Sequence, residues 1–191
     1  MAIFSKRYFI KIPKDIFVLY CEKKMLLTFI GSLSRKSLQL KLKILILKPK
    51  NTIIVTRLSF FKTSNNQKKK LKATQNTTIA LIKQIILEIS FVFSKKLIFV
   101  GVGYKAFSVV VLKNHILHFK LGFSHQIYFK ISNTLNVFCL KATTIYICGN
   151  SYQEISQISA LIRSYKYPES YKGKGILFEN EKISIKEGKK V

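Results

Sequence analysis

A twice-repeated order of strand-like and then helix-like segments constrains the fold of this chain most. In the first half, short segments rich in β-branched and aromatic residues are separated by Pro13 and Gly31. We expect strands over Tyr8–Ile12, Ile16–Cys21, Met25–Ile30, Leu38–Ile44 and Asn51–Thr56. Isoleucines then recur at the helical period from Thr74 or Thr77 to about Phe91, at Ile79, Ile82, Ile85, Ile86 and Ile89. The first half therefore predicts strands followed by one helix.

The second half repeats this order. We expect strands over Lys96–Val102, Lys105–Leu112, Ile116–Leu121, His125–Ile131, Val137–Leu140 and Thr144–Cys148, with a turn at Lys113–His115. A helix then begins near Ser151, which has capping-box spacing to Glu154, and ends before Pro168. This pattern predicts an α+β protein of two small, similar domains, each an antiparallel β-sheet with a helix packed on one face. We place an N-terminal domain at 1–93 and a C-terminal domain with a basic tail at 94–191.

A polar, charged run at Lys62–Lys70 lies between the last strand and the helix of the first half. Its composition predicts a loop. Two interpretations remain open for its lysines, contact with phosphate groups or simple solvation.

The charge balance indicates the class of partner. The 191 residues include 34 Lys and Arg against 8 Asp and Glu, a net charge of +26. No acid occurs between Glu22 and Glu88, or between Glu88 and Glu154. Such a chain repels itself unless a polyanion neutralises it, so RNA or DNA is the first candidate and an anionic membrane the second. AT-rich codon usage favours lysine but does not explain this depletion of acids.

Several chemical functions are excluded by their missing residues. Three cysteines show no paired spacing, and His115, His118 and His125 have no carboxylate or cysteine nearby in sequence, so we expect no metal site. The GxGxxA pattern at Gly101–Ala106 is followed by strand-like residues and by no ribose-binding acid, which argues against a dinucleotide cofactor. The longest apolar run is interrupted by Lys105, so we expect no membrane span. We expect no catalytic site, no cofactor and no small-molecule substrate.

The segment Arg163–Gly175 is the strongest binding signal. It contains four cations, three tyrosines and two glycines in thirteen residues. Cations bind phosphates, tyrosines stack on bases or sugars, and glycines allow the backbone to approach a ligand closely. This combination predicts a surface that lies on nucleic acid.

The same segment carries a family resemblance. Ala160–Ile176, with Leu121–His125 and Gly101–Ala106, resembles large-subunit ribosomal protein six of the bacterial and organellar type, and 186–190 is similar to that family's tail. The match is good over about 74–191 and thinner before it. Gln126 and Ser170 stand where the family usually has proline. The high Ile, Lys and Phe content and the divergent first half resemble a mitochondrially encoded copy, with a plastid or bacterial cytoplasm as alternatives.

The resemblance implies two similar α+β domains and a structural role in the large ribosomal subunit. The implied partners are large-subunit ribosomal RNA, near the translation-factor binding region, and neighbouring ribosomal proteins. We expect the RNA contacts to be shape-directed. Their first-rank residues are Arg163, Tyr165, Lys166, Tyr171, Lys172 and Lys174, and the second-rank residues are Lys105, Ser124, His125, Lys186, Lys189 and Lys190.

Two alternative functions remain. A basic DNA- or membrane-surface-binding module outside the ribosome is the main alternative, although the expected second helix is not a basic amphipathic one. A nucleic-acid-processing enzyme is the third, and the absence of clustered acids for metal ions argues against it.

Overall fold

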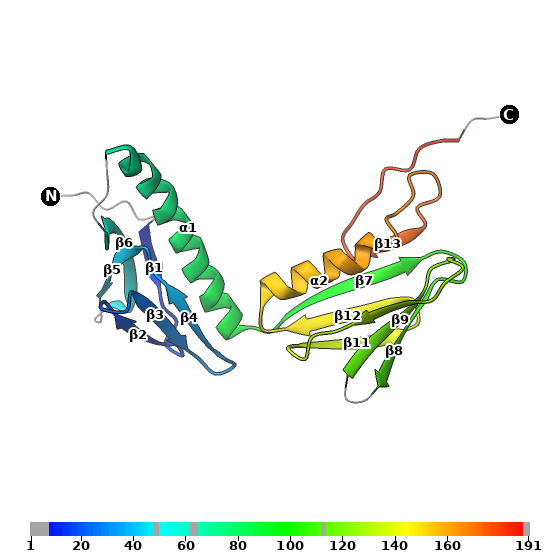
Figure 1. Cartoon of the computed structure of the whole chain (residues 1–191), viewed down its shortest axis with the longest axis horizontal. Coiled ribbons are helices and arrows are strands. Elements are labelled where there is room, and N and C mark those ends of the chain that lie inside the picture. The colour runs from blue at the N-terminus through cyan, green and yellow to red at the C-terminus, as the bar shows by residue number, and fades with distance from the viewer. Residues whose placement is uncertain (1–7, 48–49, 62–64, 112–113, 189–191) are drawn as a thin grey trace. The chain divides into compact units, whose positions relative to one another are not determined.

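The computed structural model describes residues 8–47, 50–61, 65–111 and 114–188. The chain divides into two compact units, Met1–Phe91 and Val92–Val191. Each unit combines antiparallel strands with one helix (Figure 1), which confirms the expected α+β class. Within the described residues, the strands of each unit form two sheets instead of the single sheet that was expected.

The first unit contains two three-stranded antiparallel sheets. Its strands are β1 (Phe9–Lys11), β2 (Phe17–Cys21), β3 (Leu26–Ile30), β4 (Arg35–Gln39), β5 (Leu42–Leu47) and β6 (Thr52–Ser59). The strand order is β1-β6-β5 in one sheet and β2-β3-β4 in the other. The expected segment Leu38–Ile44 therefore spans the end of β4 and the start of β5, with the buried Leu40 between them.

Helix α1 (Asn65–Ser90) packs against β3, β4 and β6 and so joins the two sheets around one core. The helical isoleucines predicted from periodicity lie there, and Ile82 and Ile89 are fully buried beside Leu27, Phe29 and Ile53. The expectation of a loop at Lys62–Lys70 is wrong from residue 65 onward, and residues 62–64 lie outside the described residues. Lysine, glutamine and leucine are good helix formers and no glycine or proline interrupts them, so the helix extends into the charged run.

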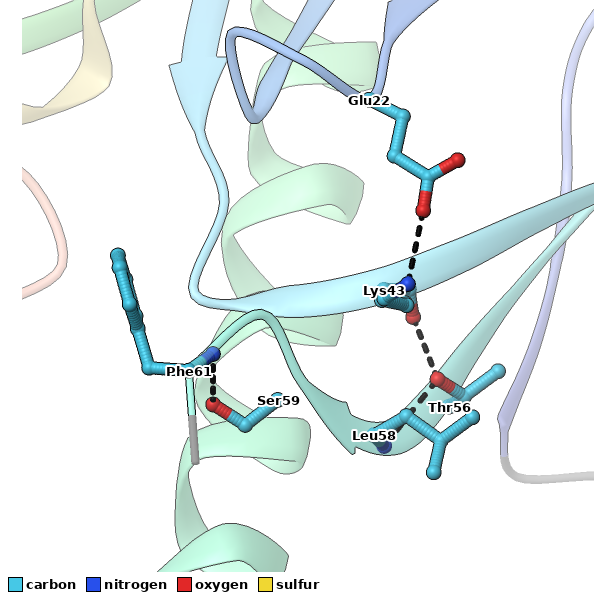
Figure 2. A network of polar contacts seen from close by, with 6 residues as sticks. All are labelled: Glu22, Lys43, Thr56, Leu58, Ser59 and Phe61. Atoms are coloured by element: carbon cyan, nitrogen blue, oxygen red, sulfur yellow. Dashed lines mark hydrogen bonds and ion pairs between the residues drawn. The ribbon is translucent and has the colours of Figure 1, made fainter. Parts of the chain in front are cut away.

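A register shift at Lys43 is accompanied by a local polar network in the first unit (Figure 2). The β5–β6 pairing is irregular between Leu42 and Ile44, and the Lys43 carbonyl there accepts a hydrogen bond from Thr56 Oγ1 at 2.7 Å. The Lys43 ammonium donates to Glu22 Oε1 at 2.9 Å, which raises the pKa of Lys43. One of the few acids thus offsets a cation from a neighbouring sheet.

The second unit contains a four-stranded and a three-stranded antiparallel sheet. Its elements are β7 (Phe93–Val100), β8 (Lys105–Val111), β9 (Asn114–Lys120), β10 (Ile127–Lys130), β11 (Leu135–Lys141), β12 (Thr144–Gly149), α2 (Tyr152–Ser164) and β13 (Gly175–Phe178). The strand orders are β11-β12-β7-β13 and β10-β9-β8. Of the expected turn at Lys113–His115, Lys113 lies outside the described residues, whereas the other two residues belong to β9.

Helix α2 packs on β7, β12 and β13 and ends at Ser164, before Pro168 as expected (Figure 1). Its buried residues Ile155 and Ile162 meet a core of strand residues that includes Leu97, Phe119 and Ile147.

The predicted capping box is wrong. Ser151 is the N-cap residue of α2 but makes no side-chain cap hydrogen bond. Glu154 instead accepts a hydrogen bond from Thr134 Oγ1 at 2.9 Å. The Glu154 carboxylate, which the sequence spacing assigned to the N-terminus of α2, is thus bound by Thr134 from the loop before β11.

The glycines at Gly101 and Gly103 form the corner between β7 and β8. Their φ angles are +151° and +78°, and the Tyr104 amide donates to the Gly101 carbonyl at 3.3 Å. A Cβ atom at Gly101 would lie 2.9 Å from the ring of Tyr104, which packs against the core. The chain continues as strand β8, so these glycines form a corner between strands and do not open a dinucleotide-binding helix.

Candidate nucleic-acid interface

The loop between α2 and β13, residues 165–174, is closed by backbone hydrogen bonds. The Glu169 amide donates to the Lys174 carbonyl, and the Gly173 amide donates to the Glu169 carbonyl, both at 2.9 Å. The Ile176 amide donates to the Lys166 carbonyl, also at 2.9 Å, and so ties the start of the loop to β13. The loop therefore has a defined shape without regular secondary structure.

Two glycines permit this shape. Gly173 has φ +67°, a left-handed conformation that L side chains rarely adopt. Gly175 has φ +155°, and a Cβ atom there would lie 2.6 Å from Pro168 Cα. The backbone at position 175 passes so close to the backbone at Pro168 that only glycine fits there. Between these glycines and Pro168, the loop presents Tyr171 and Lys172 to solvent, and Lys174 is half-buried.

The guanidinium of Arg163 is engaged by other side chains of the same unit. Its Nε donates to Glu181 Oε2 at 3.0 Å, and its Nη2 donates to Glu181 Oε1, so the pair is bidentate. The guanidinium carbon lies 5.2 Å from the ring centre of Tyr167 and 5.6 Å from that of Phe178. The guanidinium also lowers the pKa of the Glu181 carboxyl. Arg163 therefore links α2, the loop, β13 and the segment that follows β13.

Tyr165 and Lys166 face the three-stranded sheet of the same unit. The Tyr165 ring lies 6.1 Å from that of Phe119 and 6.2 Å from that of Phe129, so much of it packs on the core. Lys166 Nζ lies 4.6 Å from the ring centre of Phe123. These contacts attach the start of the loop to the β9–β10 connection.

Phe123 joins residues that are distant in sequence. Its ring stacks on His125 with a centroid distance of 5.5 Å, and Ser124 lies between them in an exposed turn. Lys166 and His125, which the sequence singled out separately, thus lie against one aromatic ring, and Ser124 is its neighbour in the chain. Phe123 itself was not predicted as a site residue, although it belongs to the segment that carries the family resemblance.

The remaining expected residues are more dispersed. Lys105 is exposed at the start of β8, where it pairs with Lys120 of β9. The Lys186 amide donates to the Ser170 carbonyl at 2.9 Å, so the segment after β13 runs beside the loop. Lys189 and Lys190 lie outside the described residues.

Other kinds of site find little support in the described part of the chain. No group of three or more His, Cys, Asp or Glu side chains that could hold a metal ion occurs there. Neither α1 nor α2 is long and apolar enough to cross a membrane. A cavity of about 660 Å³ in the first unit is lined by apolar and polar side chains in equal number, and none of its described lining residues is Asp, Glu, His or Cys.

Comparison with known proteins gives a consistent result. The family described as Ribosomal protein L6 matches residues 100–179. The chain is similar to large ribosomal subunit protein uL6 of Mycoplasma capricolum subsp. capricolum, 36% identical over 180 residues that cover 94% of this chain and 93% of that protein.

Two further relatives show the same likeness. Protein uL6 of Chloroherpeton thalassium is 39% identical over 143 residues, which cover 75% of this chain and 78% of that protein. Protein uL6m of Marchantia polymorpha is 46% identical over 91 residues, which cover 48% of this chain and 88% of that protein.

Proposed function

Because this chain belongs to the ribosomal protein L6 (uL6) family, we propose that its second unit binds large-subunit ribosomal RNA through the loop at residues 165–174. The chain is a structural constituent of the large ribosomal subunit and not an enzyme. Its partners are accordingly ribosomal RNA and other ribosomal proteins.

The shape of the loop is the observation that carries this proposal. Tyr171 and Lys172 are exposed on a backbone that is held by its own hydrogen bonds and by two glycines. A pre-shaped loop loses little conformational entropy on binding, and lysines on it can follow a fixed pattern of phosphates. The proposed contacts are Lys166, Tyr171, Lys172, Lys174, Lys105, Ser124, His125, Lys186, Lys189 and Lys190.

Arg163 and Tyr165 take a different role in this proposal. The guanidinium of Arg163 is engaged by Glu181 and by two rings, and the ring of Tyr165 packs on Phe119 and Phe129. Both residues therefore hold the loop in place, and any RNA contact that they make is secondary.

We also propose a location for the chain, near the translation-factor binding region of a mitochondrial ribosome. The relative uL6m of Marchantia polymorpha and the composition of the chain support the mitochondrial assignment. Mass spectrometry of ribosomes purified from mitochondria and from other compartments of the source organism tests it. Recovery of the chain from plastid or bacterial-type cytoplasmic ribosomes only would refute it. Chemical footprinting of large subunits with and without the chain tests the region.

The salt dependence of RNA binding tests the loop directly. The full chain is titrated with large-subunit ribosomal RNA at several salt concentrations, and the logarithm of affinity is plotted against the logarithm of salt. The double variant Lys172→Ala/Lys174→Ala should flatten this slope by about 1.4 to 1.8, because each phosphate contact adds about 0.7 to 0.9. A matched control is Lys23→Ala/Lys24→Ala, which removes two exposed lysines from the first unit.

Sedimentation of the tagged chain from lysate with magnesium complements the titration. Co-migration with the large subunit that survives high salt supports a constituent of the ribosome. Release at moderate salt, or migration with membranes, would favour the alternative of a loosely bound basic module.

In the salt titration, an unchanged slope for Lys172→Ala/Lys174→Ala would show that neither lysine contacts a phosphate.

A further inference from the structure

The three-stranded sheet β10-β9-β8 has a second face, which the ring contacts of Tyr165 do not use. Lys105, one of the RNA contacts proposed above, lies on it. Side chains alternate along each strand, and Ala106, Leu117, Phe119 and Ile127 point into the core. The residues between them therefore lie on the opposite side of the sheet. We name this side the aromatic face and define it by Lys105, Phe107, Val109, Ile116, His118, Lys120, Tyr128 and Lys130.

Strand register places three rings in one row across the aromatic face. His118 of β9 pairs with Phe107 of β8 on one side and with Tyr128 of β10 on the other. The ring centroids of His118 and Phe107 are 6.2 Å apart, and those of His118 and Tyr128 are 5.0 Å apart. The interplanar angles of 23° and 24° make this a continuous stack of near-parallel rings.

The stack ends at the sheet edge with Tyr128. Strand β10 is an outer strand of its sheet, and the Tyr128 residue is 60% exposed. Its hydroxyl donates a hydrogen bond to Gln126 Oε1, which fixes the orientation of the ring. A planar group from a partner can thus add to the stack on the open side of Tyr128, where stacking of a base needs no rearrangement of the sheet.

The surrounding charge is positive. Lys105 and Lys120 are exposed and form the neighbouring cross-strand row on one side of the ring row, and Lys130 is exposed in the neighbouring row on the other side. Lys120 Nζ lies 6.0 Å from the ring centre of Phe107. None of the eight residues that define the face is acidic. A face of this kind suits a ligand with planar groups joined by phosphates better than it suits an apolar protein surface.

One polar atom on the aromatic face is buried. His118 Nε2 is inaccessible to solvent and has no hydrogen-bond partner in the part of the chain that the structure describes. Buried polar atoms without a partner are rare in folded proteins, because the loss of hydration is not compensated.

We propose that the aromatic face binds an unpaired RNA base, which stacks on Tyr128 while Lys130, Lys120 and Lys105 meet the flanking phosphates. The proposal rests on the RNA-binding function proposed above and adds to it a second surface, distinct from the loop at residues 165–174. Stacking recognises any base by its π face, so this site selects single-stranded RNA over duplex without a sequence preference.

Base stacking is tested with the full chain and a short single-stranded RNA that carries the fluorescent base 2-aminopurine. Binding of the wild type should quench the fluorescence, and a duplex of equal charge should compete poorly. Tyr128→Ala should weaken binding about 5- to 150-fold and reduce the quenching, whereas Tyr128→Phe should stay within about twofold. Tyr128→Leu keeps apolar bulk without a ring and should behave like Tyr128→Ala. Phe138→Ala, at a 55% exposed ring on β11 of the other sheet, is the matched control and should bind like the wild type.

Salt titration with the same probe separates stacking from charge. Lys130→Ala should lower the salt slope by about 0.7, the value for one phosphate of a single strand, and Tyr128→Ala should leave the slope unchanged. If both Tyr128→Ala and Tyr128→Leu bind the probe with the affinity of the wild type, the proposal is overturned. So would a loss of ribosomal-protein binding by these variants with RNA binding intact, because a protein would then occupy the face.

The outcomes also separate this proposal from the proposed function. If the Lys172→Ala/Lys174→Ala variant shows its expected salt slope and the Tyr128 variants bind the single-stranded probe normally, the aromatic face alone is refuted. If the wild type fails to bind both large-subunit ribosomal RNA and the probe, both proposals are refuted together.

Discussion

Replacement of Arg163 by alanine should loosen the loop that follows α2. The side chain makes a bidentate ion pair with Glu181, and both partners are about a quarter exposed, at 24% each. It also lies against the rings of Tyr167 and Phe178, at 5.2 and 5.6 Å. A single substitution therefore removes every one of these contacts among α2, the loop and the segment after β13.

The magnitude follows from these contacts. A partly solvated ion pair contributes about 1 kcal/mol at most, because water and salt screen it. Each cation–π contact contributes about 0.5 to 1 kcal/mol. Arg163→Ala should therefore destabilise the docked loop by about 1 to 3 kcal/mol. Arg163→Lys should cost less, because it keeps the charge and loses the forked geometry that matches the carboxylate.

The destabilisation should depend on pH. Arg163 lowers the pKa of Glu181 from its ordinary value of 4.5, so the pair stabilises the folded chain fully above that value. This stabilisation is lost as the pH falls through the lower folded value. The stability difference between the wild type and Arg163→Ala should thus be largest near neutral pH and shrink below about pH 4.5.

Amide hydrogen exchange and RNA titration measure the two consequences. The Phe178 amide donates to Glu181 Oε2 at 3.2 Å and should exchange faster in Arg163→Ala. Affinity for large-subunit ribosomal RNA should fall while the salt slope stays unchanged, since no phosphate contact is removed. A slope that falls by about 0.7 to 0.9 would refute this reasoning and make Arg163 a phosphate contact, as the sequence first suggested.

Two further predictions concern backbone geometry and capping. Gly175→Ala should disrupt the loop and weaken RNA binding, at a cost of about 1 to 3 kcal/mol or more, because its Cβ would meet Pro168 at 2.6 Å with φ at +155°. The control Gly188→Ala has no atom within 4 Å of the added Cβ, and thermal unfolding and RNA titration should find it unchanged. Ser151→Ala should destabilise the second unit by clearly less than the usual 1 kcal/mol or so for a lost N-cap, since Ser151 makes no side-chain cap bond and Glu154 is bound elsewhere. Denaturant unfolding measures it, and a loss of about 1 kcal/mol or more would show that Ser151 does cap α2.

Local periodicity predicted much of the secondary structure. The isoleucines of α1 and α2 became buried core residues because the helical period places them on one face. Strand-like composition likewise located most of the strands. Strand β13 was missed, because its four residues have little pattern of their own and are held in the sheet by pairing with β7. The start of α1 was missed because the charged run at Lys62–Lys70 can form either a loop or a solvent-exposed helix, and its composition does not distinguish the two.

For the candidate binding site, too, the sequence predicted some features and the tertiary structure decided others. The sequence alone indicated that the chain needs a polyanionic partner and predicted that the segment after α2 binds it, because composition and charge do not depend on tertiary contacts. Only the tertiary structure decided that Arg163 is engaged by Glu181, that Phe123 gathers Lys166 and His125, and that Tyr128 extends a stack of rings. The physical reason is that these partners come from different strands and loops, and only strand register and packing bring their side chains within contact distance.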